Sequence, residues 1–283
     1  YTLLLLLLAS ALLLLLRHLR LRSSGALLGY AACASVALTL HYSAVGALGV
    51  FGLLVLADGM VSGFGRPEWR RLVMAQLGPG LTLVVLYAWH LRGLMSSSMA
   101  DGALEGWLST FLVRGPADAW LGLVGVHSSL VGDHLAASAT VVTLLGLVWA
   151  AWTRRWTVLL CGGGAIVIAV VGAVAGLYPM GATRHTSWLL VFVTPVLAWT
   201  VGTMLAPEPV GWSVRARVVP ALLLVALVAG AGLSSSILDS DRRPREIAER
   251  MLRMDHMDAM SETLDPDGEP RLVLMSTETY QFL

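Results

Sequence analysis

The sequence predicts an all-α integral membrane protein. It would have about eight transmembrane helices, a helix in one outer loop and the start of a C-terminal extracytoplasmic α/β domain. Composition is the first observation, because 57% of the 283 residues are hydrophobic and 13% are charged, whereas soluble domains carry about 25% charged residues. The second is the length of the apolar stretches, which approach the roughly 20 residues that a membrane span needs. The third is a change of composition near residue 239, which divides a transmembrane domain (1–238) from an incomplete second domain (239–283).

Eight apolar stretches are the candidate transmembrane helices. They lie at about 1–16, 25–41, 43–60, 72–91, 135–153, 156–177, 187–205 and 218–237. Pro179 ends the sixth stretch and Pro207 the seventh, since proline cannot continue a helix. The first stretch is short and starts at Tyr1 with no methionine or basic lead-in, and Leu283 ends the chain inside an apparent strand. We therefore expect both ends of the sequence to be truncated.

Arginine sets the orientation of these stretches, because the sequence contains no lysine. Ten arginines flank one side of the predicted membrane: Arg17, Arg20, Arg22, Arg66, Arg70, Arg71, Arg154, Arg155, Arg215 and Arg217. Three flank the other side: Arg92, Arg114 and Arg184. Short loops rich in arginine face the cytoplasm. The turn at 41–42, the 92–134 loop, the hinge at 184–185 and the tail are therefore predicted to face outward.

Two regions outside the spans are predicted to hold structure of their own. The 92–134 loop is long for a connection, and it contains apolar residues at helical spacing: Leu104, Trp107, Leu108, Phe111 and Leu112. This pattern favours a helix lying in the outer membrane interface, or alternatively a packing helix over the span ends. In the second domain the sequence predicts an amphipathic helix over about 247–260, a turn at 265–268 and a strand at 271–276.

Arg184 and His185 interrupt an apolar region between two predicted spans. A guanidinium can bind a phosphate through two parallel hydrogen bonds, and the N–H groups at the start of the seventh span add positive potential. Thr183 or Ser187 can cap that helix. The pair therefore predicts a phosphate or pyrophosphate clamp. In the alternative interpretation, Arg184 extends to lipid headgroups and His185 caps a helix at the interface.

His41 and Tyr42 form a second polar turn, at the outer end of the second span. Such a pair can hydrogen-bond a sugar or a phosphate, or it can anchor the helix ends at the interface. The remaining polar residues favour structural roles. Asp133 is predicted to cap the fifth span, His18 is predicted to be cytoplasmic and solvated, and the pattern assigns no role to His127.

Several classes of site are absent from the sequence. It contains no HExxH, P-loop, GxSxG or CxxC pattern, so no metal site is predicted and no cofactor is assigned, although a divalent metal is left open. Cys33 and Cys161 lie in apolar stretches, as small core residues do. No carboxylate occupies the middle of a span, which disfavours a proton-driven carrier. The net charge of +1 gives no indication of a nucleic-acid partner.

Three segments resemble motifs of bacterial polytopic glycosyltransferases of the GT-C superfamily, the group related to protein mannosyltransferases and aminoarabinose transferases. Residues 1–5 resemble the end of an R-x-Y-x-L-L entry to an early span. Residues 39–44 resemble a T-H-Y-F turn, and 178–185 resemble a Y-P-F-G-G-x-R-H segment before a late span. Ser43 stands where an aromatic residue is common, and Ala182 where a second glycine is common. Neither difference removes the polar groups.

The resemblance implies a transferase that takes a sugar from a polyprenyl-phosphate donor at the extracytoplasmic face of the bacterial inner membrane. It implies substrate binding by Arg184, His185, His41 and Tyr42, with membrane lipid as a further partner. The catalytic acid residue of such enzymes lies in a first outer loop, which would precede Tyr1, so no catalytic residue is assigned in this sequence. The sugar and the acceptor are not specified. A lipid or solute transporter, a flippase and a non-catalytic membrane scaffold are the alternatives.

Overall fold

The computed structural model describes residues 1–92, 111–181 and 183–205, without the side chains of residues 90, 91, 184, 204 and 205. The described residues belong to one compact unit, and every regular element among them is a helix. Six helices are long and apolar enough to cross a membrane, and a further apolar helix has 17 residues. Seven of the eight predicted stretches therefore coincide with helices. The eighth stretch, 218–237, and the predicted domain 239–283 lie outside the described residues.

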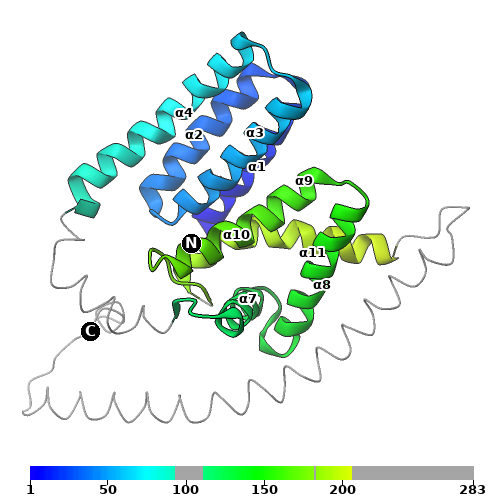
Figure 1. The fold of residues 1–283 in the computed structure, drawn as a ribbon. Coiled ribbons are helices and arrows are strands. Elements are labelled where there is room, and N and C mark those ends of the chain that lie inside the picture. Colours follow the sequence, from blue (N-terminus) through cyan, green and yellow to red (C-terminus); the bar gives the residue numbers. More distant parts are fainter. Residues whose placement is uncertain (93–110, 182, 206–283) are drawn as a thin grey trace, which may run out of the picture. The chain divides into compact units, whose positions relative to one another are not determined.

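Four helices joined by short connections open the chain (Figure 1): α1 (Thr2–Leu21), α2 (Ser24–Leu40), α3 (Ala44–Ser62) and α4 (Arg66–Leu86). Helix α1 extends beyond the predicted 1–16 and ends at Arg22, whose left-handed φ of 55° stops it. Ser23 then begins α2 by accepting a hydrogen bond from the Ala26 N–H over 3.3 Å. Gly63, with φ of 62°, ends α3. A π-helical turn, η1 (Tyr87–Leu91), continues α4.

A second group of helices follows: α7 (Pro116–Val131), α8 (Asp133–Trp152), α9 (Trp156–Val158), the π-helical turn η3 (Leu159–Gly163), α10 (Gly164–Val174), the 3₁₀ helix η4 (Arg184–Leu189) and α11 (Leu190–Leu205). The sequence did not predict α7, because the expected loop helix was centred on 104–112, and residues 104–110 lie outside the described residues. The Asp118 carboxylate begins α7 by accepting hydrogen bonds from the Arg114 and Gly115 N–H groups (2.9 and 3.1 Å).

The start of α8 corrects one prediction. Gly132, with φ of 79°, occupies the cap position that was expected for Asp133. Asp133 is instead the first helical residue, where its carboxylate suits the positive end of the helix dipole.

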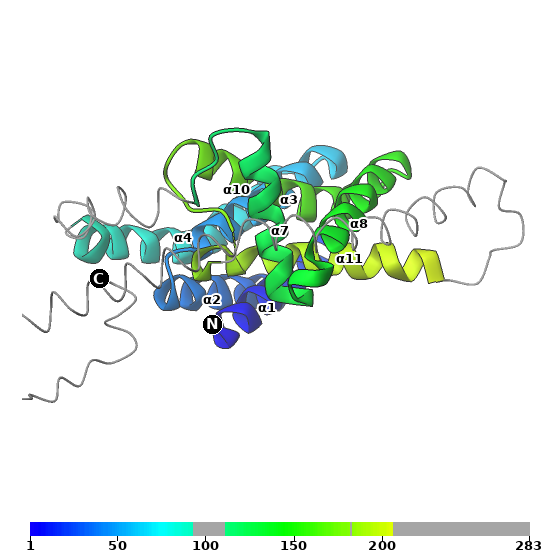
Figure 2. The same ribbon diagram turned by 90° about the horizontal axis from the view of Figure 1, so that it is seen from below.

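Aromatic side chains join the two groups of helices. Tyr30 of α2 packs edge-to-face on Phe51 of α3, with 5.5 Å between ring centroids. Phe51 contacts Phe192 of α11 (5.7 Å), and Phe192 contacts Trp188 of η4 (5.9 Å). All four rings are buried, so this row holds α11 and η4 against α3. Helix α10 also packs against α3, and the two lie side by side in both views (Figures 1 and 2).

A glycine makes room for the last ring of this row. A Cβ atom added to Gly46 of α3 would lie 2.4 Å from Cζ2 of Trp188, far inside van der Waals contact. The indole therefore packs directly on the α3 backbone. Because η4 carries both Trp188 and His185, this close approach fixes where the polar hinge lies relative to the α2–α3 turn.

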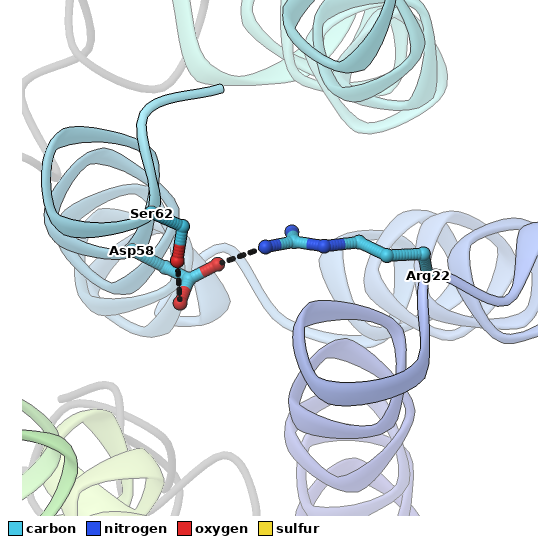
Figure 3. A network of polar contacts seen from close by, with 3 residues as sticks. All are labelled: Arg22, Asp58 and Ser62. Carbon is cyan, nitrogen blue, oxygen red and sulfur yellow. Dashed lines mark hydrogen bonds and ion pairs between the residues drawn. The ribbon is translucent and has the colours of Figure 1, made fainter. Parts of the chain in front are cut away.

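The two ends of the first four helices differ in chemistry. At one end Arg22 Nη2 lies 3.2 Å from Asp58 Oδ2, and the Ser62 hydroxyl donates to Asp58 Oδ1 over 3.3 Å (Figure 3). His18 is at the same end, but the prediction that it is solvated was wrong: it is buried, and its Nδ1 donates to the Ser23 carbonyl over 2.9 Å. The 20 residues of α1 place the opposite end about 30 Å away.

Candidate functional site

Three segments that are distant in sequence meet at that opposite end: the start of α1, the turn 41–43 and the stretch 178–189. The His41 ring stacks on Tyr42 with centroids 4.8 Å apart, and it lies 5.3 Å from the His185 ring. The Tyr42 hydroxyl and His185 Nδ1 are 2.9 Å apart. Tyr1 lies 5.5 Å from His41, and Tyr178 lies edge-on to His185 at 6.3 Å. These five residues form the histidine–tyrosine cluster.

The α2–α3 turn fixes the tautomer of His41. This residue ends α2 in an extended conformation, and the Ser43 N–H donates to its Nδ1 over 3.1 Å. The Ser43 hydroxyl is buried and lies 2.7 Å from the same nitrogen. Since Nδ1 accepts from the backbone N–H, neutral His41 carries its proton on Nε2. Ser43 therefore positions the imidazole, and Nε2 is its donor atom.

His185 is the buried member of the cluster, with 6% of its surface exposed, while Tyr42 is 38% exposed. When the Tyr42 phenol donates to Nδ1, neutral His185 also carries its proton on Nε2. The His185 carbonyl accepts a hydrogen bond from the Tyr178 hydroxyl. Burial raises the pKa of Tyr178, so this phenol stays protonated. The backbone and the ring of His185 are thus each held by a tyrosine.

The stretch before α11 is shaped by its own hydrogen bonds. The Thr186 hydroxyl donates to the Gly181 carbonyl, and the Thr186 N–H donates to the Thr183 carbonyl over 3.2 Å. Thr183 occupies the N-cap of η4, one of the two caps that the sequence predicts, but its side chain makes no capping bond. Gly181 has φ of 153°, and a Cβ there would lie 2.9 Å from the Phe111 ring. The Phe111 carbonyl accepts from the Met180 N–H over 2.9 Å, so the 92–134 loop packs on this stretch at Phe111.

The structure brings His41, Tyr42 and His185 together, although Tyr42 and His185 are 143 positions apart in the sequence. The side chain of Arg184 lies outside the described part of the structure, and its backbone begins η4 directly before His185. Binding of substrate by these four residues stays a prediction. Tyr1 and Tyr178 belong to the sequence motifs but had no predicted role, and nothing in the sequence indicates Ser43 as the group that orients His41.

The cluster offers hydrogen-bond donors and no carboxylate. Two imidazole Nε2–H groups at one helix end can donate hydrogen bonds to oxygen atoms of a phosphate or a sugar, while the Tyr42 phenol orients the His185 ring. Among the described residues, no group of three or more His, Cys, Asp or Glu side chains could hold a metal ion. The hydrogen-bonding groups of these residues can bind and orient a polar ligand.

A buried polar network that the sequence pattern does not indicate surrounds His127 of α7. Its Nδ1 donates to the Leu123 carbonyl over 2.9 Å, and its Nε2 lies 2.9 Å from the Thr143 hydroxyl of α8. The Thr140 hydroxyl lies 3.1 Å from Nδ1. The contacts of His127 with Thr140 and Thr143 depend on the packing of α7 against α8, which the sequence pattern does not reveal. The network ties α7 to α8 beside the site, since α7 also contacts η4.

This network predicts a pH dependence of stability. Burial lowers the pKa of His127 below its ordinary 6.5, so the unfolded chain binds this proton more readily than the folded one. The contribution to the free energy of unfolding is complete above pH 6.5 and is lost as the pH falls below that value. We expect the Tm in detergent to drop as the pH falls below 6.5, and His127→Gln to reduce this drop. A drop of equal size in wild type and His127→Gln would contradict the assignment.

Comparison with known proteins found no relative, since no protein family, curated protein sequence or solved structure matches the chain. The resemblance to GT-C glycosyltransferases therefore depends on residues 1–5, 39–44 and 178–185. These are the segments that contribute to the histidine–tyrosine cluster.

Proposed function

We propose that the protein is a multi-pass glycosyltransferase of the bacterial inner membrane, which moves a sugar from a polyprenyl-phosphate donor to an acceptor on the extracytoplasmic face. Six helices long and apolar enough to span a membrane support the multi-pass arrangement, and 218–237 would add a further span. The observation that carries the rest is the 2.9 Å contact between Tyr42 and His185. It joins two separate segments that each resemble a GT-C motif.

The proposed reaction uses this cluster to hold the leaving phosphate. The acceptor hydroxyl attacks the anomeric carbon and gives its proton to a carboxylate that acts as general base, as the resemblance implies. The bond between the anomeric carbon and the phosphate oxygen breaks, and the polyprenyl phosphate leaves with the bonding electrons. Arg184 offsets the negative charge that grows on this phosphate, while His41, Tyr42 and His185 orient its oxygens.

The positions of the arginines support a site outside the cytoplasm. Arg17 lies near the C-terminal end of α1 and Arg22 directly follows this helix, whereas Tyr1 directly precedes it. In the second group, Arg155 precedes the apolar helix Trp156–Val174 and Tyr178 follows it. The 19 residues of this helix separate Arg155 from Tyr178 by about 28 Å. Since arginine-rich connections stay in the cytoplasm, the cluster belongs to the opposite face.

The test is transfer from defined donors by the full-length protein in membrane vesicles, using a panel of radiolabelled polyprenyl-phosphate sugars. We expect label to move from at least one donor to an endogenous acceptor. A folded protein that transfers label from none of the donors would contradict the proposal. A scaffold would, in addition, keep its cellular role when His41 and His185 are both replaced, whereas the transferase would not.

Tyr42→Phe is predicted to lower the transfer rate about three- to tenfold, the effect of removing one hydrogen bond of ordinary strength. The change deletes the phenol that contacts His185 and keeps the ring that stacks on His41. Tyr30→Phe is the matched control, because it deletes a phenol that bonds Gln76 in the helix core. Initial rates of label transfer decide the outcome, and equal rates for the two variants would remove Tyr42 from the site.

A further inference from the structure

A groove lies at the arginine-bearing end of the first four helices, between the first turns of α2 and α4. Its volume is about 650 Å³, and its lining includes Leu27, Leu28, Arg66, Arg70, Arg71 and Met74. Next to the groove, α2 and α4 are joined by a hydrogen bond from Gln76 Nε2 to the Tyr30 hydroxyl (2.8 Å). The groove is thus built on two helices that are held together in the core.

The arginines of the groove have no acidic partner in the part of the chain that the structure describes. Arg66, Arg70 and Arg71 are all exposed, and the ion pair found among the described residues joins Arg22 to Asp58 instead (Figure 3). Glu68, the acidic residue in the first turn of α4, is directed toward Gly65 and forms no ion pair in these ranges. The lining of the groove therefore carries three arginines that form no ion pair with a described residue, and no carboxylate.

Two helix N-termini add to this positive potential. Helix α2 begins at Ser24 and α4 begins at Arg66, and both of these residues line the groove. N–H groups in a first turn have no partner within their helix, so they can donate to an anion, except at Pro67 of α4, which has no N–H. Only one of these groups, the Ala26 N–H, is known to be capped by a side chain.

The other wall of the groove is apolar and open. Leu28 is 70% exposed and Met74 is 58% exposed, and both lie within helices that would enter the bilayer next to the arginines. A site with cations at one end and exposed apolar side chains at the other is complementary to a phospholipid. The three arginines attract a headgroup of net negative charge, and no described carboxylate in the groove lining would receive the ammonium group of a zwitterionic lipid.

We propose that this groove binds an anionic phospholipid of the cytoplasmic leaflet. Its phosphate lies among Arg66, Arg70 and Arg71, and an acyl chain follows Leu28 and Met74. The site is distinct from the histidine–tyrosine cluster, because it lies at the opposite end of the first four helices. It does not depend on the proposed transferase activity.

The test is native mass spectrometry of the full-length protein in detergent, titrated with phosphatidylglycerol or with phosphatidylcholine of the same acyl chains. We expect phosphatidylglycerol to bind at least about tenfold more tightly, and Arg66→Gln/Arg70→Gln/Arg71→Gln to abolish the difference. Arg17→Gln/Arg154→Gln/Arg155→Gln removes the same charge from exposed positions predicted on the same face, and should keep the preference. If the triple variant does not fold, the three single substitutions replace it, and each should reduce the preference for phosphatidylglycerol in part.

Two results would overturn the assignment of the three arginines to a lipid phosphate. One is an equal loss of preference in the control triple variant, which would show attraction by overall charge alone. The other is full competition by the soluble headgroup glycerophosphoglycerol at the concentration of the lipid, which would show a free-phosphate site. Leu28→Ser/Met74→Ser should weaken lipid binding several-fold through loss of apolar contact, and an unchanged affinity would likewise exclude the acyl-chain contact.

Discussion

Replacing Arg184 with alanine is expected to reduce sugar transfer at least about 100-fold, the usual loss when a preorganised group that stabilises developing charge is removed. The physical reason is that the leaving phosphate gains negative charge as the glycosidic bond breaks, and the guanidinium is the cation next to His185 in the hinge. The measurement is the initial rate of label transfer from the active polyprenyl-phosphate donor. Insertion into the membrane should be unchanged.

Arg114→Ala is the matched control for this experiment. It removes one positive charge from the same predicted face, at an exposed position whose backbone N–H, rather than its side chain, bonds Asp118. We expect transfer by this variant to stay within about twofold of wild type, as for an exposed charge screened by solvent. Normal turnover by Arg184→Ala, or an equal loss in Arg114→Ala, would remove the phosphate clamp from the mechanism.

The second large effect is expected from Gly46→Ala. The added methyl group would lie 2.4 Å from Trp188 Cζ2, so either the indole or helix α3 must move. Overpacking of this kind costs about 1–3 kcal/mol in the free energy of unfolding. Because η4 also carries His185, we expect transfer activity to fall together with the Tm in detergent.

Gly52→Ala tests whether this effect is local to the contact. Gly52 lies on the same helix, and an added Cβ there meets no atom within 4 Å. Alanine favours a helix over glycine by about 1 kcal/mol, so Gly52→Ala should leave the Tm equal or slightly higher. If both variants have the Tm of wild type, the position of Trp188 does not depend on its close approach to α3.

The apolar helices could be predicted from the sequence because burial in a hydrocarbon layer requires long apolar runs. Proline, glycine and arginine residues mark where these runs end. Helix α7 could not, since its 16 residues depend on packing against α8 and on the Asp118 cap. His18 was misplaced for a related reason. Its ring folds back to the Ser23 carbonyl in the tight α1–α2 connection, and no periodic pattern encodes that contact.

The candidate site was predictable only in outline. Alternation of helices across a membrane requires the 41–42 turn and the 184–185 hinge to share one face, but it leaves their separation open. The 2.9 Å contact between Tyr42 and His185 depends on how α3, α10 and α11 pack. That packing is set by Gly46, Trp188 and their neighbours, through shape complementarity that a single sequence does not display.

The central claim is that the histidine–tyrosine cluster opens on the face opposite the arginine-rich connections, outside the cytoplasm. Thiol labelling of intact cells with a membrane-impermeant maleimide tests it directly, in a Cys33→Ser/Cys161→Ala background. Tyr42→Cys and Arg154→Cys place thiols at two exposed positions, one in the cluster and one in the turn after α8. We predict labelling of Tyr42→Cys alone in intact cells and of both variants after permeabilisation. Labelling of Arg154→Cys alone in intact cells would contradict the claim.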